Sequence, residues 1–162
     1  MSEVATSEVA TATQLLVRPA SRTDAATLIE FNLQMAREVE GLELDPAVVR
    51  RGVHAVFDDP RKGDYWIAER EGEVIGSLLT GYEWSVRRNG RLCWLLSLYV
   101  VPEARGRWIY NRLMEHVRRT AKAQADVVGI LLYVDKRNLR AQRIAHSMRM
   151  IGDRYVLYEW LK

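Results

Sequence analysis

The chain has 162 residues, of which 48% are apolar and 28% charged. This length is typical of one domain and allows a core that needs neither disulfides nor a structural metal. No apolar stretch reaches the roughly 18 residues of a membrane span. The single cysteine, Cys93, cannot form an internal disulfide, so we expect a cytoplasmic protein with Cys93 in its core.

The net charge of +3 is unevenly distributed along the chain. Residues 105–122 carry a net charge of +5, residues 136–149 carry another +5, and the remaining residues carry −7. Two basic segments on an otherwise acidic chain indicate an anion site or an anionic partner, and two solvated helix faces are the alternative. Nucleic-acid binding is not expected, because the chain has no recognised binding motif and only a modest net charge.

The predicted organisation is a disordered leader, residues 1–13, followed by one domain over residues 14–162. The leader is rich in Ser, Thr, Ala and Glu, and it carries none of the Lys or Arg that a signal peptide needs. The domain opens with a short strand, Gln14–Arg18, which Pro19 ends.

A helix is predicted from Ser21 to about Val39. Asp24 stands three residues after Ser21, close to a capping box, and Gly41 ends the helix. The apolar residues that recur at helical spacing are Ala25, Leu28, Ile29, Leu33 and Ala36.

A second helix is predicted to start at Asp45-Pro46, an N-cap residue followed by proline at the first helical position. A loop over Asp58–Gly63 then leads into the strands. The apolar face of this helix consists of Val48, Val49, Val53, Val56 and Phe57.

Three strands joined by hairpins come next. Tyr65–Glu69 and Val74–Ser85 flank a short turn containing Gly72, and Asn89-Gly90 is a strong hairpin turn. The following strand, Arg91–Val101, is apolar at both odd and even positions, which is typical of a strand covered on both faces. Because hairpins join these strands, they should pair antiparallel.

The remaining elements are a helix over residues 107–125, a strand Val127–Val134, a helix Asn138–Met148 and a last strand Tyr155–Leu161. A strand, a crossover helix and a strand form a βαβ unit, so strands 91–101 and 127–134 should run parallel. The predicted fold class is therefore mixed α/β (α+β), with antiparallel hairpins, one βαβ unit and helices on both faces of the sheet.

The junction between strand 91–101 and the next helix has the features of an anion site. Unpaired backbone N–H groups at a helix start attract negative charge, and the helix dipole adds to this. Arg105 and Arg107 supply charged donors in the loop itself. The sequence therefore predicts a phosphate-binding loop here.

The same residues resemble the GNAT superfamily of acetyl-CoA-dependent N-acetyltransferases. Val100–Arg107 matches the lead-in to the family's Arg/Gln-x-x-Gly-x-Gly/Ala loop, whose amides hold the CoA pyrophosphate. A second family motif, Asn-x-x-Ala-x-x-x-Tyr-x-x-x-Gly-Phe/Met, reads here as Asn138, Ala141, Ala145, Arg149 and Met150. The resemblance covers residues 15–160 and implies a splayed pair of parallel strands at the cofactor site. The residues it implies for cofactor binding are Leu98, Tyr99, Val100, Arg105, Gly106, Arg107, Trp108, Ile109, Tyr110 and Asn138.

The chain departs from the family pattern at several of these positions. Trp108 and Tyr110 stand at the two loop glycines, and Arg149 stands at the glycine of the second motif. The tyrosine that commonly protonates the departing thiolate aligns with Ala145, which has no proton to donate. Trp108 either points aside or reshapes the CoA site.

No catalytic residue is assigned from the sequence. Candidates that could replace the missing tyrosine are Glu83, Tyr133, His146, Tyr155 and Tyr158. Ser97 is the only polar side chain near the centre of strand 91–101, and a hydroxyl is a poor base. No His or Cys spacing predicts a metal site.

Two functions are compatible with these residues. The first is an acetyl-CoA-dependent N-acetyltransferase in which a primary amine, from a small molecule or a protein, attacks the thioester directly. The second is a catalytically impaired or redesigned GNAT scaffold that binds a protein through the helix faces around Trp108 and Met148. Trp, Met and Arg are enriched at interface centres. The sequence is also compatible with a homo-oligomer.

Overall fold

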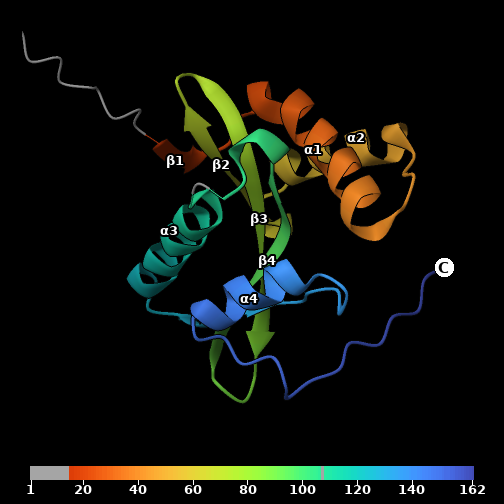
Figure 1. The fold of residues 1–162 in the computed structure, drawn as a ribbon. Helices are drawn as coiled ribbons and strands as arrows, with labels where there is room; N and C mark the ends of the chain where they lie inside the picture. Colours follow the sequence, from red (N-terminus) through yellow and green to blue (C-terminus); the bar gives the residue numbers. More distant parts are fainter. Residues whose placement is uncertain (1–14, 107) are drawn as a thin grey trace, which may run out of the picture.

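The computed structural model describes residues 15–106 and 108–162, so the predicted leader, Gln14 and Arg107 lie outside the described residues. Five strands form one sheet in the order β1-β2-β3-β4-β5, antiparallel except for the parallel pair β4–β5 (Figure 1). This confirms the predicted mixed α/β fold. The elements are β1 (Leu15–Pro19), α1 (Ala25–Met35), α2 (Pro46–Asp58), β2 (Asp64–Arg70), β3 (Glu73–Ser85), β4 (Gly90–Val100), α3 (Ile109–Ala123), β5 (Val127–Leu132) and α4 (Leu139–Ser147).

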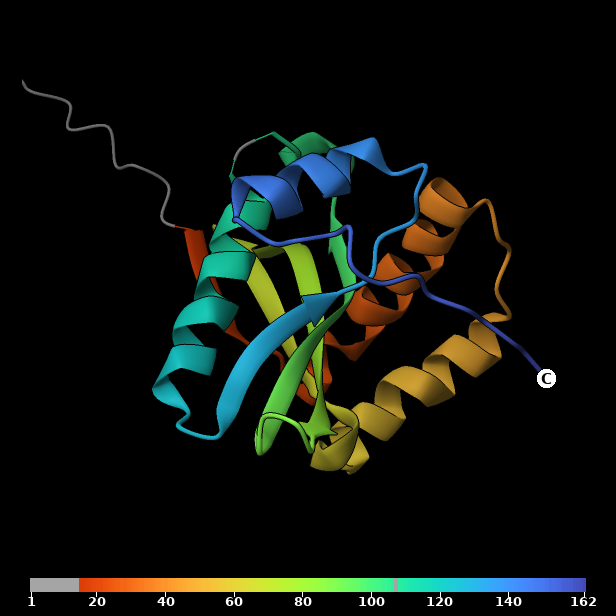
Figure 2. The same cartoon turned by 90° about the horizontal axis from the view of Figure 1, so that it is seen from below.

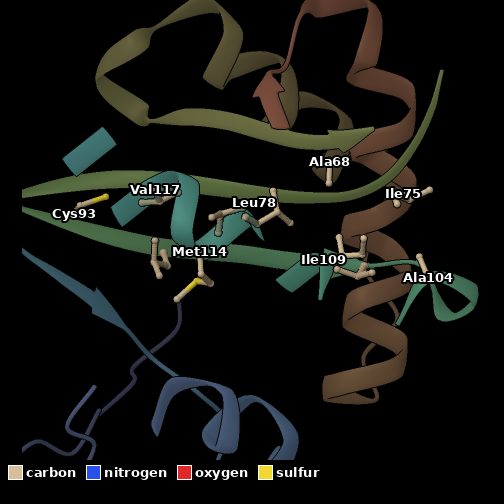
Figure 3. Packing of buried hydrophobic residues seen from close by; sticks show 11 residues of the cluster. Ala68, Ile75, Leu78, Cys93, Ala104, Ile109, Met114 and Val117 are labelled. Carbon is tan, nitrogen blue, oxygen red and sulfur yellow. The ribbon is translucent and has the colours of Figure 1, made fainter. Parts of the chain in front are cut away.

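Helices cover both faces of the sheet: α1 and α2 lie on one side and α3 on the other (Figure 2). Ile67 packs on the α1–α2 side and the next residue, Ala68, packs on the α3 side, as strand alternation requires. Cys93 is buried in the α3-side core (Figure 3), and burial raises the pKa of its thiol to about 11. No helix of the described residues is long and apolar enough to cross a membrane.

Positive φ angles mark the predicted ends of several elements. Glu71 and Gly72 form the β2–β3 turn with φ of 54° and 79°, and Asn89 precedes β4 with φ of 48°. After α1 the chain continues as a π-helix, Ala36–Glu40, which Gly41 ends at φ 69°. Glycine is suited to that position because it adopts left-handed backbone without steric cost.

The predicted last strand, Tyr155–Leu161, is wrong. Residues 148–162 form neither helix nor strand, and side chains 151–162 are all exposed. A β-strand exists only where a neighbouring strand satisfies its backbone N–H and C=O groups, and no described strand of this chain lies beside the segment. The apolar composition of residues 155–161 is typical of a strand, but no strand of the described residues pairs with this segment.

A β-bulge in β4 separates its two halves. Between the pairs Leu79–Leu96 and Ser77–Tyr99, three residue steps on β4 face two on β3, and Ser97 has φ of 45°. The pairing of β4 with β5 ends at Leu95–Leu132, although β4 continues to Val100. The second half of β4 therefore has a neighbour on one side only, which is the strand separation that the family resemblance implied.

Two residues that stand where the family pattern has glycine have a left-handed backbone. Trp108 has φ of 64° and Arg149 has φ of 61°, both in the left-handed region that favours glycine. Trp108 is the residue before the first turn of α3. Both residues therefore adopt a conformation that is unfavourable for residues with a side chain.

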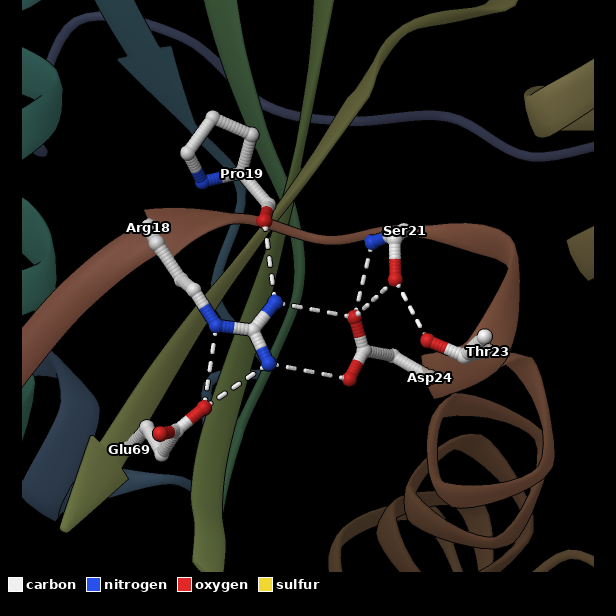
Figure 4. Close-up of polar contacts among 6 residues, drawn as sticks. All are labelled: Arg18, Pro19, Ser21, Thr23, Asp24 and Glu69. Carbon is white, nitrogen blue, oxygen red and sulfur yellow. Dashed lines mark hydrogen bonds and ion pairs between the residues drawn. The ribbon is translucent and has the colours of Figure 1, made fainter. Parts of the chain in front are cut away.

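A charged cluster joins β1 to the start of the first helix (Figure 4). The Arg18 guanidinium donates to Glu69 at 2.7 Å and to Asp24 at 3.0 Å, and the backbone N–H of Ser21 donates to Asp24 at 2.7 Å. These hydrogen bonds, above all those from Arg18, hold the pKa of the nearly buried Asp24 carboxyl below 3.8. The cluster fixes the edge strand to the helix that follows it.

Replacing Asp24 by Asn should lower the free energy of unfolding by about 1–3 kcal/mol, because the Arg18 guanidinium loses one of its two charged acceptors. Since the folded-state pKa of Asp24 is lowered, its contribution is present above pH 3.8 and is lost as the pH falls through the folded-state value. Urea denaturation from pH 7 down to pH 2 should therefore show a smaller acid-induced loss in Asp24→Asn than in the wild type. The control is Asp58→Asn, which removes an exposed carboxyl paired with Arg22. Equal losses of stability in the two variants would contradict this role of Asp24.

The left-handed backbone at position 108 can be tested with two variants that both remove the indole. Trp108→Gly should be about 1 kcal/mol more stable than Trp108→Ala, because alanine pays the steric cost of positive φ and glycine does not. Urea denaturation of both proteins measures this difference. Equal stabilities would mean that residue 108 does not adopt this conformation in solution.

Candidate functional site

The open half of β4 presents backbone groups that no strand uses. The N–H of Val101 donates to Ile75 O on β3 at 3.0 Å, so by strand alternation the groups of Leu98 and Val100 point to the side that β5 has left. The carbonyl of Val100 accepts a hydrogen bond from Arg105 Nε at 2.9 Å. Tyr99 pairs with Ser77, so its own backbone faces β3. Of the three predicted positions, Leu98 and Val100 have groups available on the open side.

The Arg105 side chain holds the loop against the first helix through Glu38, rather than projecting as a free donor. Its guanidinium forms an ion pair with Glu38 and lies over the Tyr99 ring, 5.4 Å from the centroid. The Tyr99 hydroxyl is 2.9 Å from Glu38 Oε1 and 2.8 Å from Gln34 Oε1, and burial, followed by the nearby Glu38, raises its pKa to about 12. These contacts, which we call the Glu38 cluster, neutralise Arg105 and position the loop.

A surface cavity of about 310 Å³ lies between the start of α3 and α4. Among the described residues, no side chain caps the first turn of α3, and the backbone N–H groups of Ile109, Tyr110 and Asn111 have no partner within the helix. The helix dipole makes this terminus attractive to anions. The cavity is lined by Gly106, Trp108, Tyr110, Asn111, Arg140, Arg143, Ile144 and Ser147.

Two arginines of α4 face the α3 terminus across this cavity. Arg140 lies over the Tyr110 ring at 5.6 Å, and Arg143 follows one turn later on the same helix face. Neither arginine forms an ion pair with a carboxylate of the described residues. Two unpaired guanidinium groups and an uncapped helix start converge here, which is an arrangement suited to phosphate groups.

Trp108 lines this cavity but does not fill it, since its side chain is 74% exposed. The Ile109 side chain is buried in the core, which leaves only its amide for the site. Asn138 caps α4 by accepting a hydrogen bond from Ala141 N at 3.0 Å. Met148, expected on a binding surface in the scaffold hypothesis, packs half-buried against the α3-side core.

Of the catalytic candidates, the structure brings Glu83 and Tyr133 together through Trp94. Trp94 Nε1 donates to Glu83 Oε2 at 2.8 Å, and the Trp94 and Tyr133 rings are 6.0 Å apart. Tyr133 directly follows Leu132, the last β5 residue paired with β4, so this group lies where the strands part. His146 is exposed at the end of α4, and Tyr155 and Tyr158 are exposed in the C-terminal segment. No cluster of metal-ligating side chains exists among the described residues.

Sequence reasoning missed Arg140, Arg143, Glu38 and Trp94 as parts of the site. The net charge of residues 136–149 indicated an anion site, and the three-residue spacing of Arg140 and Arg143 on a predicted helix could have identified them. No sequence pattern connects Glu38 to Arg105, because 67 residues separate them. Their contact depends on how the first helix packs across β4.

Comparisons with known proteins agree with this geometry. The sequence model of the Acetyltransferase (GNAT) family matches residues 28–148. A possible acetyltransferase from Clostridium difficile 630 is 35% identical, with a TM-score of 0.85 over 91% of this chain and 97% of that one. A comparison with curated protein sequences finds no match.

Two more distant structures with bound ligands share the fold. A predicted acetyltransferase from Clostridium acetobutylicum, solved with acetyl-CoA, is 17% identical, with a TM-score of 0.72 over 90% of this chain and 96% of that one. An aminoglycoside N-acetyltransferase in complex with CoA is 13% identical, with a TM-score of 0.78 over 95% of this chain and 99% of that one. With the family match over residues 28–148 and the separated β4–β5 pair, this chain belongs to the GNAT acetyltransferase family.

Proposed function

We propose that this protein is an acetyl-CoA-dependent N-acetyltransferase that acetylates a primary amine. The strongest support comes from two sets of hydrogen-bonding groups, one set on β4 without a strand partner and one set at the start of α3 without a carboxylate partner. The Leu98 and Val100 backbone groups line the open half of β4, and the cavity with Arg140 and Arg143 continues at the α3 start. A long ligand with a thioester at one end and phosphates at the other matches that order of groups.

The residues present fit acetyl-CoA despite the departures from the family pattern. Trp108 is exposed beside the cavity, and its backbone lies in the left-handed region that glycine favours. When bound, acetyl-CoA supplies an activated thioester to the attacking amine. Arg140 and Arg143 would hold phosphate groups, and the α3 amides would add further donors. The open edge of β4 would orient the pantetheine arm by strand-like hydrogen bonds.

Glu83, Trp94 and Tyr133, which we call the Glu83 group, would receive the acceptor amine. The group lies at the separation point of β4 and β5, where the acetyl end of the bound cofactor is expected. A carboxylate beside two aromatic rings attracts an ammonium ion through charge and cation–π interaction. Glu83 would also accept the proton that the ammonium must lose before its nitrogen can attack the thioester directly.

Calorimetric titration of acetyl-CoA should give saturable binding. The double variant Arg140→Ala/Arg143→Ala should weaken that binding at least about 100-fold, because two charged hydrogen bonds are lost and each contributes about 1.5–3 kcal/mol. The matched control is Arg118→Ala, which removes an exposed arginine from α3 outside the cavity. The proposed function is wrong if the wild type shows neither binding nor acetyl transfer, and recovery of binding in Trp108→Gly would then support the scaffold hypothesis.

Glu83→Gln should raise the KM for a cationic amine about 5- to 10-fold, because the amide loses the charge that attracts the ammonium. Thiol release from acetyl-CoA in the presence of a linear diamine measures the rate. The Kd for acetyl-CoA should stay unchanged, which separates loss of acceptor binding from loss of cofactor binding. Glu73→Gln, at the other end of β3, is the control. An unchanged KM in Glu83→Gln would contradict the assignment.

A further inference from the structure

The Trp108 indole lines the cavity between α3 and α4 but takes no part in the packing of the fold. Its side chain is 74% exposed. Among the described residues, no aromatic ring and no guanidinium group lies against this indole. Trp66 and Trp94, in contrast, each combine a ring contact with a hydrogen bond donated by Nε1. Packing therefore does not explain a tryptophan at position 108.

The backbone of Trp108 is nevertheless fixed in place. The next residue, Ile109, is buried in the α3-side core, and Arg112 N donates to Trp108 O at 3.0 Å. The φ of 64° is unfavourable for a residue with a side chain, so glycine would be the more stable residue here. Unfavourable backbone conformations of this kind cluster at ligand-binding positions. Stability does not explain the tryptophan either, which leaves contact with a ligand.

The cavity combines the two kinds of side chain that bind a nucleotide. It lies where α4 crosses the start of α3 (Figure 2), and its volume of about 310 Å³ is sufficient for part of a ligand. Guanidinium groups such as those of Arg140 and Arg143 pair with phosphates, whereas flat aromatic side chains stack on bases. The Tyr110 ring already stacks with Arg140. The Trp108 indole is therefore the ring of this cavity that can receive a base.

We propose that the Trp108 indole stacks on the base of the acyl donor and so selects a thioester that carries a nucleotide. This inference rests on the proposed function, which assigns Arg140 and Arg143 to the phosphate groups. In acetyl-CoA the adenosine is attached directly to those phosphates, so its base lies near the residues that hold them. Trp108 lines the same cavity as both arginines. A phosphopantetheine thioester on a carrier protein has the same reactive end but no base, so it lacks this contact.

Calorimetry with the full chain tests the contact by comparing CoA with 4′-phosphopantetheine, which has no nucleotide. Trp108→Ala should weaken CoA binding at least about 5-fold, because it removes the ring on which the base stacks. Alanine keeps the Cβ and therefore the same backbone restriction, so the loss reports on the indole itself. Trp108→Phe keeps a ring and should retain most of the affinity for CoA. Binding of 4′-phosphopantetheine, measured by displacement of CoA, should be the same in all three proteins.

Trp84→Ala is the matched control for loss of an exposed indole. Trp84 is 57% exposed and pairs with Arg91, at the end of β4 opposite to the start of α3. Its replacement should leave the affinity for both ligands unchanged. Equal losses for CoA and 4′-phosphopantetheine in Trp108→Ala would place the indole against the phosphate or the pantetheine arm and overturn the proposal. Unchanged CoA binding would also overturn it, and so would tighter CoA binding, which would show that the indole obstructs the cavity.

Indole fluorescence provides a second measurement that needs no acetyl transfer. Titration with adenosine 3′,5′-bisphosphate should quench the emission of the wild type and of Trp84→Phe, and the quenching should be absent from Trp108→Phe. Quenching that persists in Trp108→Phe would overturn the proposal. The two measurements also separate this inference from the proposed function. Acetyl transfer without any effect of Trp108→Ala on CoA binding contradicts this inference alone, whereas quenching that depends on Trp108 in a protein without acetyl transfer contradicts the proposed function alone.

Discussion

The β-bulge at Ser97 is the constraint on which the candidate site depends. It adds one residue to β4 relative to β3, and pairing between β4 and β5 stops at Leu95. If β4 and β5 stayed paired to their ends, the Leu98 and Val100 groups would be used within the sheet. The bulge therefore leaves part of a buried strand with backbone groups that no neighbouring strand uses. The strain of a non-glycine residue at positive φ is compatible with a functional position.

Charge in the site is divided between two sets of residues with different tasks. Arg105 is neutralised by Glu38, and its Nε donates to Val100 O, so it fixes the loop between β4 and α3. The arginines without carboxylate partners among the described residues of the cavity are Arg140 and Arg143 on α4. An arginine that positions the loop and arginines that can contact an anion thus come from different segments. The π-helix that carries Glu38 is consistent with this division, because such local widening of a helix occurs frequently at functional positions.

The sequence by itself determined the helices and strands, except for the wrongly predicted last strand, and most of their boundaries. Apolar spacing, the Asn89-Gly90 turn and Gly41 depend on local chemistry, and each was found where expected. The parallel β4–β5 pair followed from the crossover helix that joins the two strands. The loop from Val100 to Tyr110 also carried enough local pattern to indicate the family and an anion site.

Only the tertiary structure decided what each side chain contacts. Glu38 meets Arg105, and Glu83 meets Trp94, because packing brings together residues that are distant in sequence. The segment 155–161 shows the same limit from the other direction. Its composition specifies a strand, but a strand forms only against a partner backbone, and the identity of that partner is a property of the assembled molecule rather than of the local sequence.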